Sequence, residues 1–113
     1  MAEYIHWNDF KKLEIKVGTV VEVNNFPEAK NLAYQLKIDL GSKMGIKQSS
    51  AQITELYSIK DLLGRQVLVV VNLFPKKIGP FISDCLITGF YNEKGSVILA
   101  IPERKITDDS LLS

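Results

Sequence analysis

Cysteine and histidine are almost absent from this sequence of 113 residues, which has one of each, Cys85 and His6. A single cysteine excludes an internal disulfide, and these two side chains are too few for a structural zinc site. A Cys–His pair and a Ser–His–Asp arrangement would both have to use His6, and the ordinary interpretation is a packed cysteine and a surface histidine. We therefore expect no catalytic residues, no metal, no cofactor, and a protein that is not an enzyme.

Long hydrophobic runs and phosphate-binding glycine motifs are missing as well. No apolar stretch approaches the ~18 residues of a membrane span, and residues 1–9 lack the basic and then apolar pattern of a signal peptide. The glycines do not have the spacing of a dinucleotide-binding loop or a P-loop. These absences predict a soluble, cytoplasmic protein without membrane insertion.

Net charge is small, at +1, but its distribution is uneven. Residues 1–36 carry four basic and five acidic side chains, residues 37–77 carry seven and three, and residues 78–113 carry three and five. A localised basic surface attracts an anionic partner even on a nearly neutral protein. The middle of the chain therefore points to such a surface, with scattered solvated lysines as the alternative.

What the sequence does contain is a regular alternation of apolar and polar residues. Residues 14–23 and 34–40 alternate with the period of two that half-buried strands need, and residues 46–50 predict a short third strand. A short helix is expected between Ser58, whose hydroxyl can cap its first turn, and Gly64, which can end it in the left-handed conformation.

The second half of the chain adds a continuous apolar strand and a hairpin. Residues 66–73 include a run of Val and Leu that is typical of a strand covered on both faces. Residues 75–80 begin and end with proline and predict a loop. Residues 85–91 and 96–101 predict a hairpin, because the turn at residues 92–95 ends in a glycine that can adopt a positive φ.

Together these elements predict one all-β domain over residues 1–113. With 46% hydrophobic and 24% charged residues, the composition is that of a globular chain. Five strands with a short helix before the fourth are typical of a five-stranded Greek-key barrel of the OB-fold type. A β-sandwich is the alternative, although it usually has about seven strands.

Both ends of the chain are rich in large apolar residues, which something must cover. They either close the ends of the barrel or form one half of a self-complementary dimer surface, with residues 1–13 and 103–113 as dimerisation extensions. The residues expected in such a dimer interface are Tyr4, Ile5, Trp7, Phe10, Ile106 and Leu111.

Two polar stretches with apolar neighbours are candidates for ligand binding. Residues 45–52 offer a lysine and several side chains that both donate and accept hydrogen bonds. Residues 72–83 place two phenylalanines on either side of a lysine pair. Rings beside cations suit a single-stranded nucleic acid, and an apolar floor with a polar rim equally accepts an extended polypeptide. The alternative is that the rings plug the end of the barrel while the lysines stay solvated.

Several segments resemble a known family. Residues 11–20 resemble the opening strand of the tRNA-binding domain family, and residues 24–30 resemble the loop that follows it. Residues 39–54, which include Gly-Ile-Lys-Gln-Ser-Ser-Ala-Gln-Ile-Thr, look like the CsaA branch of that family, and so do residues 71–78 and 81–84. The resemblance covers nearly the whole chain.

This resemblance implies an OB-fold homodimer that joins through its terminal extensions and has no catalytic activity. CsaA-type proteins are regarded as export-related chaperones that bind unfolded or precursor polypeptides in the cytoplasm, and related stand-alone domains bind tRNA by shape. We therefore expect a CsaA-like chaperone, with a tRNA-binding module as the alternative. An apolar floor is expected from Phe74, Ile78 and Phe81. The other expected contact residues are Lys47, Gln48, Ser49, Ser50, Asn72, Lys76, Lys77 and Ser83.

Overall fold

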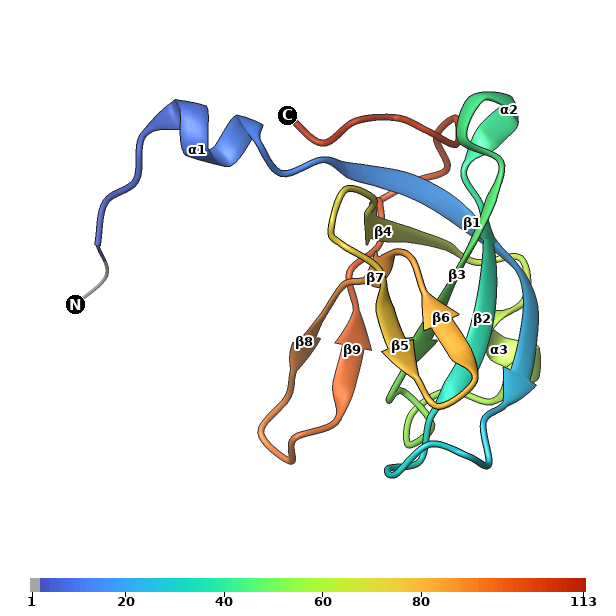
Figure 1. The fold of residues 1–113 in the computed structure, drawn as a ribbon. Helices are drawn as coiled ribbons and strands as arrows, with labels where there is room; N and C mark the ends of the chain where they lie inside the picture. The colour runs from blue at the N-terminus through green and yellow to red at the C-terminus, as the bar shows by residue number, and fades with distance from the viewer. Residues whose placement is uncertain (1–2) are drawn as a thin grey trace.

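The computed structural model describes residues 3–113, and its centre is a five-stranded antiparallel sheet that curls into a nearly closed barrel (Figure 1). The sheet has the strand order β3-β2-β1-β4-β7. Its strands are β1 (Ile15–Asn25), β2 (Tyr34–Asp39), β3 (Ile46–Ala51), β4 (Gln66–Val70) and β7 (Leu86–Ile87). The prediction of an all-β, five-stranded barrel of the OB-fold type is confirmed.

Strand β1 belongs to both halves of the barrel. Its first half, Ile15 to Thr19, pairs with β4, and its second half pairs with β2 as far as Asn25. A bulge between Val20 and Glu22 separates the two halves. A β-bulge bends a strand and increases its twist, so this irregularity lets one strand turn the corner of the barrel. Strand β1 ends at Asn25, two residues beyond the strand end predicted at residue 23.

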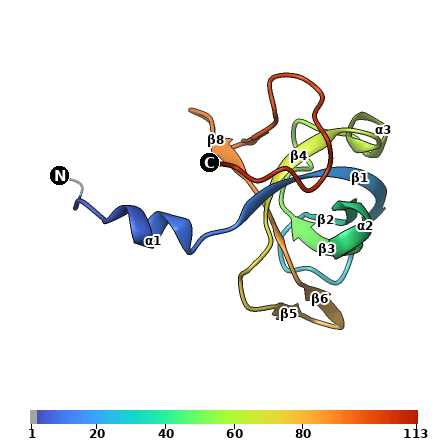
Figure 2. The same cartoon turned by 90° about the horizontal axis from the view of Figure 1, so that it is seen from above.

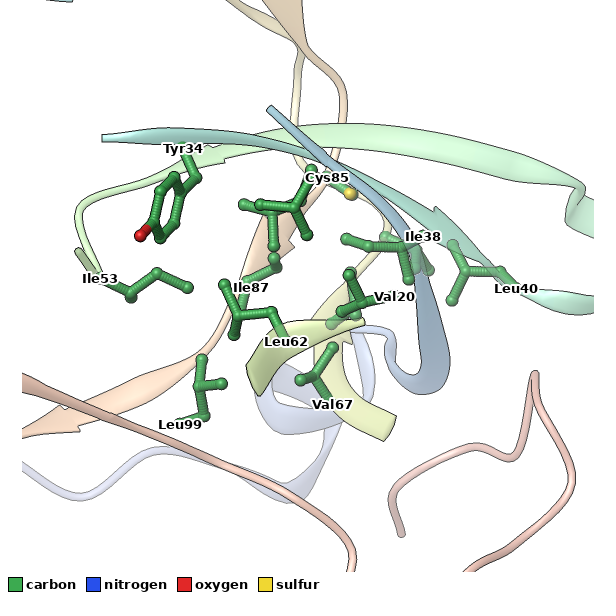
Figure 3. Close-up of a cluster of buried hydrophobic side chains, with 14 residues drawn as sticks. Val20, Tyr34, Ile38, Leu40, Ile53, Leu62, Val67, Cys85, Ile87 and Leu99 are labelled. Carbon is green, nitrogen blue, oxygen red and sulfur yellow. The ribbon is translucent and has the colours of Figure 1, made fainter. Parts of the chain in front are cut away.

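Buried side chains from β1, β2, β4 and β7 fill the barrel, and Ala51 of β3 packs against them (Figure 3). The alternation in residues 34–40 is confirmed, because Leu36, Ile38 and Leu40 are fully buried while Lys37 is exposed. Leu62 of helix α3 (Ile59–Leu62) enters the same cluster and is fully buried. Apolar burial of this kind is the main favourable term in folding.

Helix α3 forms where the sequence predicted a short helix. The Ser58 hydroxyl accepts a hydrogen bond from the Asp61 N–H at 3.2 Å, and the Asp61 carboxylate accepts one from the Ser58 N–H at 3.0 Å. This reciprocal capping box satisfies two backbone donors at the start of the helix. Gly64 follows with φ +83°, as expected. Two further helices lie outside the predicted elements, namely α1 (Trp7–Lys11) and α2 (Gly41–Met44).

The second half of the chain differs from the sequence prediction at three places. The strand expected at residues 66–73 ends at Val70. The strand expected at residues 85–91 is divided at Thr88, since β7 pairs with β4 whereas β8 (Gly89–Tyr91) pairs with β9 (Val97–Leu99). The predicted loop at residues 75–80 is instead part of a separate hairpin. This hairpin comprises β5 (Lys76–Ile78) and β6 (Phe81–Ser83).

The two ends of the chain behave differently. The C-terminal segment runs along β1, where the Val17 N–H donates to the Ser110 carbonyl at 3.0 Å and the Leu112 N–H donates to the Ile15 carbonyl at 2.8 Å. The N-terminal arm, residues 3–13 with α1, extends away from the barrel in both views (Figures 1 and 2). None of its residues is buried, so the arm does not close the end of this barrel. No helix within residues 3–113 is long and apolar enough to cross a membrane.

Candidate ligand-binding surface

The candidate surface consists of the outer edge of β3 and the β5–β6 hairpin, which lie next to one another (Figure 1). In the hairpin, Lys76 pairs with Ser83, Lys77 with Ile82, and Ile78 with Phe81. Paired residues share a face of a two-stranded sheet, and successive residues alternate between faces. The two lysines therefore point to opposite faces of the hairpin, and a ligand lying flat on one face meets only one of them.

One face of the hairpin is turned toward the barrel. The Ser83 hydroxyl lies 3.4 Å from the Ser50 N–H, and the ring of Phe81 lies 5.3 Å from the ring of the buried Phe26. Ile78, on the same face, is half-buried. Phe81 thus attaches the hairpin to the barrel, and Ile78 lies beside it on the same face.

Phe74 stands apart from these two residues. Its side chain is 99% exposed, and it lies four residues before Ile78, which is about 13 Å along an extended chain. The expected apolar floor is therefore not one continuous patch. It divides into a free ring at the base of the hairpin and a packed pair at its tip.

The strand predicted at residues 46–50 is confirmed as β3, and the expected contact residues at positions 47–50 lie on it with alternating side chains. Lys47 and Ser49 pair with Ile38 and Leu36, whose side chains fill the barrel. Ser49 is fully buried and its hydroxyl donates to the Ser50 carbonyl at 3.1 Å. We therefore remove Ser49 from the candidate surface, because a side chain without exposed area cannot touch a ligand.

The amide of Asn72, one of the expected contact residues, makes two hydrogen bonds to the backbone before β1. Its Oδ1 accepts a hydrogen bond from the Glu14 N–H at 2.9 Å, and its Nδ2 donates to the Lys12 carbonyl at 2.6 Å. Both polar atoms of the amide thus hold the segment between α1 and β1. The side chain fixes where the N-terminal arm leaves the barrel.

Cys85 has the environment of a structural residue. The side chain is buried in the core cluster, and this burial, with a smaller contribution from the charge of Asp84, raises the pKa of its thiol to about 12 (Figure 3). A thiol with such a pKa stays protonated at neutral pH and is a poor nucleophile. His6 lies on the exposed arm.

Sequence reasoning missed several exposed residues beside the expected ones. Ile82 is half-exposed on the face of the hairpin that carries Lys77, and Lys37 is exposed on β2 opposite Gln48. The strict alternation of residues 34–40 already placed Lys37 outward, and that signal was available. The pairing of Lys77 with Ile82 was hidden, because residues 75–80 were interpreted as a loop.

A second, apolar surface covers the outside of β1 and β4. A groove of about 260 Å³ lies there, with Ile15, Leu68, Ile101, Ile106 and Leu111 among its lining residues. Phe90 and Ile98 are opposite one another on β8 and β9, and both side chains are exposed. The expected interface residues Tyr4, Ile5 and Trp7 are exposed on the arm, whereas Phe10 is half-buried and stacks near Trp7 at 5.2 Å.

Comparison with known proteins gives this geometry a context. Residues 15–108 match the family model described as "Putative tRNA binding domain". The chain belongs to the tRNA-binding domain family. It is 35% identical to the methionine–tRNA ligase of Thermococcus onnurineus over 105 residues, which are 93% of this chain and 14% of that enzyme. The chain thus spans about one seventh of the length of such curated relatives.

Two of the similar solved structures are CsaA chaperones that cover nearly the whole chain. The chaperone CsaA of Bacillus anthracis has a TM-score of 0.92 and 39% identity, covering 98% of this chain and 100% of its own. The CsaA chaperone of Picrophilus torridus has a TM-score of 0.92 and 40% identity, covering 97% and 100%. The resemblance to the CsaA branch of the tRNA-binding domain family is confirmed.

The different surroundings of the two rings lead to a stability prediction. Phe81→Ala should lower the free energy of unfolding by about 1–2 kcal/mol, because it removes a half-buried ring from its contact with Phe26. Phe74→Ala should change it by less than about 0.5 kcal/mol, because the side chain is free. Urea unfolding of both variants and the unaltered protein measures this difference. Equal losses would contradict the assignment of Phe81 to packing.

Proposed function

We propose that this chain is a CsaA-like chaperone that binds unfolded or precursor polypeptides in the cytoplasm, in connection with export, and that it carries out no catalysis. The observation that carries the proposal is the match of nearly the whole chain with two CsaA chaperones at about 40% identity. The candidate surface supports it, because exposed apolar side chains lie beside lysines there, and extended polypeptides present both apolar and acidic groups.

In this proposal the ligand makes apolar contacts at two places, Phe74 at the base of the hairpin and Ile82 on its outward face. Their side chains are 99% and 50% exposed. Lys76 and Lys77 are exposed on opposite faces and meet acidic groups and carbonyl oxygens of the ligand. Lysine is a flexible point charge, so these contacts favour negative groups without selecting one sequence.

The alternative function is a tRNA-binding module that uses the same surface. The match to the tRNA-binding domain model over residues 15–108 favours it, as does the excess of basic side chains in residues 37–77. Lysines that contact phosphates contribute affinity without reading base sequence, which suits recognition by shape.

We also propose that the chain is a homodimer. The N-terminal arm exposes Tyr4, Ile5 and Trp7 and does not pack on its own barrel, while an apolar groove remains open outside β1 and β4. An exposed arm and an open apolar groove on one chain are self-complementary, as a two-fold dimer requires. Two candidate surfaces per dimer would increase apparent affinity for a ligand that reaches both.

The chaperone proposal predicts that the free ring contributes to client binding. Phe74→Ala should weaken suppression of the aggregation of a denatured precursor polypeptide severalfold, because the exposed apolar contact is lost. Leu63→Ala provides the control, since Leu63 follows α3 and is 48% exposed. Light scattering of the aggregating client measures the effect. If the Phe74→Ala variant suppresses aggregation as fully as the unaltered protein, the ring of Phe74 does not belong to the binding surface.

The tRNA alternative predicts a specific salt dependence. A lysine that contacts a phosphate contributes about 0.9 to the slope of log K against log salt concentration. Lys76 and Lys77 face opposite ways, so RNA on one face contacts only one of them. Replacing that lysine with alanine should flatten the slope by about one unit, and replacing the other lysine should leave the slope unchanged. Titrations of bulk tRNA at several salt concentrations measure the slopes. Two unaltered slopes would exclude both lysines from the RNA contact.

The dimer proposal predicts a molecular mass of about twice 12.7 kDa at micromolar concentration. Trp7→Asp should shift the mass toward the monomer, because it places a charge on the apolar arm, whereas Leu63→Asp should leave the mass unchanged. Light scattering over a range of protein concentrations checks both. A monomer throughout this range for the unaltered protein would contradict the proposal.

A further inference from the structure

The β5–β6 hairpin has no strand partner outside itself among residues 3–113. A two-stranded hairpin is marginally stable on its own, so its orientation depends on its attachment to the barrel. One attachment is the contact between the rings of Phe81 and Phe26. This contact lies at the tip of the hairpin, where Phe81 is opposite Ile78.

Besides the 3.4 Å hydrogen bond from the Ser50 N–H to the Ser83 hydroxyl, a further attachment is a set of hydrogen bonds around Gln48, on the outer edge of β3. The Gln48 backbone N–H donates to Asp84 Oδ1 at 2.8 Å, and the Gln48 carbonyl accepts from the Asp84 N–H at 3.0 Å. The Gln48 side-chain Nε2 donates to the Ile82 carbonyl at 2.7 Å. Gln48 therefore holds the end of β6 with three of its polar groups, and Asp84 provides a side chain where a neighbouring strand would provide a carbonyl.

A carboxylate at this place opposes the charge of the surface around it. Lys76 and Lys77 lie on the hairpin, so the charge of Asp84 reduces the attraction for an anionic ligand. The same carboxylate makes a charge-assisted hydrogen bond to a backbone N–H, roughly twice as strong as a neutral one. Asp84 is half-buried, which limits the competition of water for this bond.

We infer that Asp84 is a positioning residue: by accepting the Gln48 N–H it fixes the β5–β6 hairpin against β3, and so fixes where the hairpin lysines and Ile82 meet the ligand. The inference rests on the proposed function as far as the ligand is concerned. The orientation of the hairpin itself is measurable in the free protein.

Hydrogen exchange of individual amides, followed by NMR, tests the attachment without a ligand. Asp84→Ala removes the acceptor, whereas Asp84→Asn removes the charge and keeps an acceptor oxygen. Protected amides of residues 76–83 should exchange at least about tenfold faster in Asp84→Ala and close to the original rate in Asp84→Asn. Amides of β1 and β2 should keep their protection in both variants.

Binding of bulk tRNA and of a denatured polypeptide tests the consequence. Both substitutions remove the same negative charge, so charge alone predicts that both tighten tRNA binding equally. Positioning predicts instead that Asp84→Ala binds both ligands about fivefold or more weakly than Asp84→Asn. Equal affinities of the two variants would overturn the inference.

Gln48→Glu is the second variant, in case Asp84→Ala does not fold. It keeps the shape of the side chain but replaces the donor that faces the Ile82 carbonyl with an acceptor, and it should also speed exchange in the hairpin. Unchanged hairpin exchange in Gln48→Glu and Asp84→Ala would overturn the inference. If the unaltered protein binds neither ligand, the proposed function fails, while hairpin exchange still decides whether Asp84 positions the hairpin.

Discussion

The double pairing of β1 is the constraint on which the rest of the structure depends. This strand of 11 residues pairs with β4 through its first half and with β2 through its second half. The bulge between Val20 and Glu22 bends the strand. The five strands can then close around one core. Close approach is needed at Gly18, where a Cβ would lie 2.4 Å from Ile38 Cγ2. A larger side chain at position 18 of β1 would collide with Ile38 of β2 and force these two strands apart.

Closure of the sheet leaves the β5–β6 hairpin outside it. The five strands use one another as partners, and in the segment between β4 and β7 strand β5 pairs with β6. Exposed strand edges are hazardous because they pair with other chains, and proline and lysine reduce that hazard. β5 is a lysine-rich strand that directly follows Pro75. The features that make this segment basic and irregular in sequence are thus also features that protect an edge.

Much of the fold was predictable because the signals were local. The alternation in residues 34–40 and the cap at Ser58 each act within a few residues, and both are confirmed. The site was less predictable because its geometry depends on distant partners. Asn72 bonds to the Glu14 N–H, 58 residues away along the chain, and no local pattern indicates such a contact.

Polarity was a misleading signal on β3. Ser49 is hydrophilic by type, but its position opposite Leu36 places it in the barrel, where its hydroxyl finds the Ser50 carbonyl. A buried hydroxyl with a partner avoids the cost of an unsatisfied polar group, so a serine is tolerated at an inward position. Pairing register therefore decides which polar residues reach a ligand, and it separates Lys76 from Lys77 in the same way.

The arrangement of the surfaces bears on how a binding protein of this size works. The candidate surface lies at the β3 edge and the hairpin, whereas the arm leaves beside the start of β1, and the apolar groove covers β1 and β4 (Figures 1 and 2). In the sheet order β2 lies between β3 and β1, so a copy docked on the groove outside β1 and β4 would not cover the outer edge of β3. In the proposed dimer, association would use the outside of β1 and β4, and ligand binding would use the edge of β3 and the hairpin.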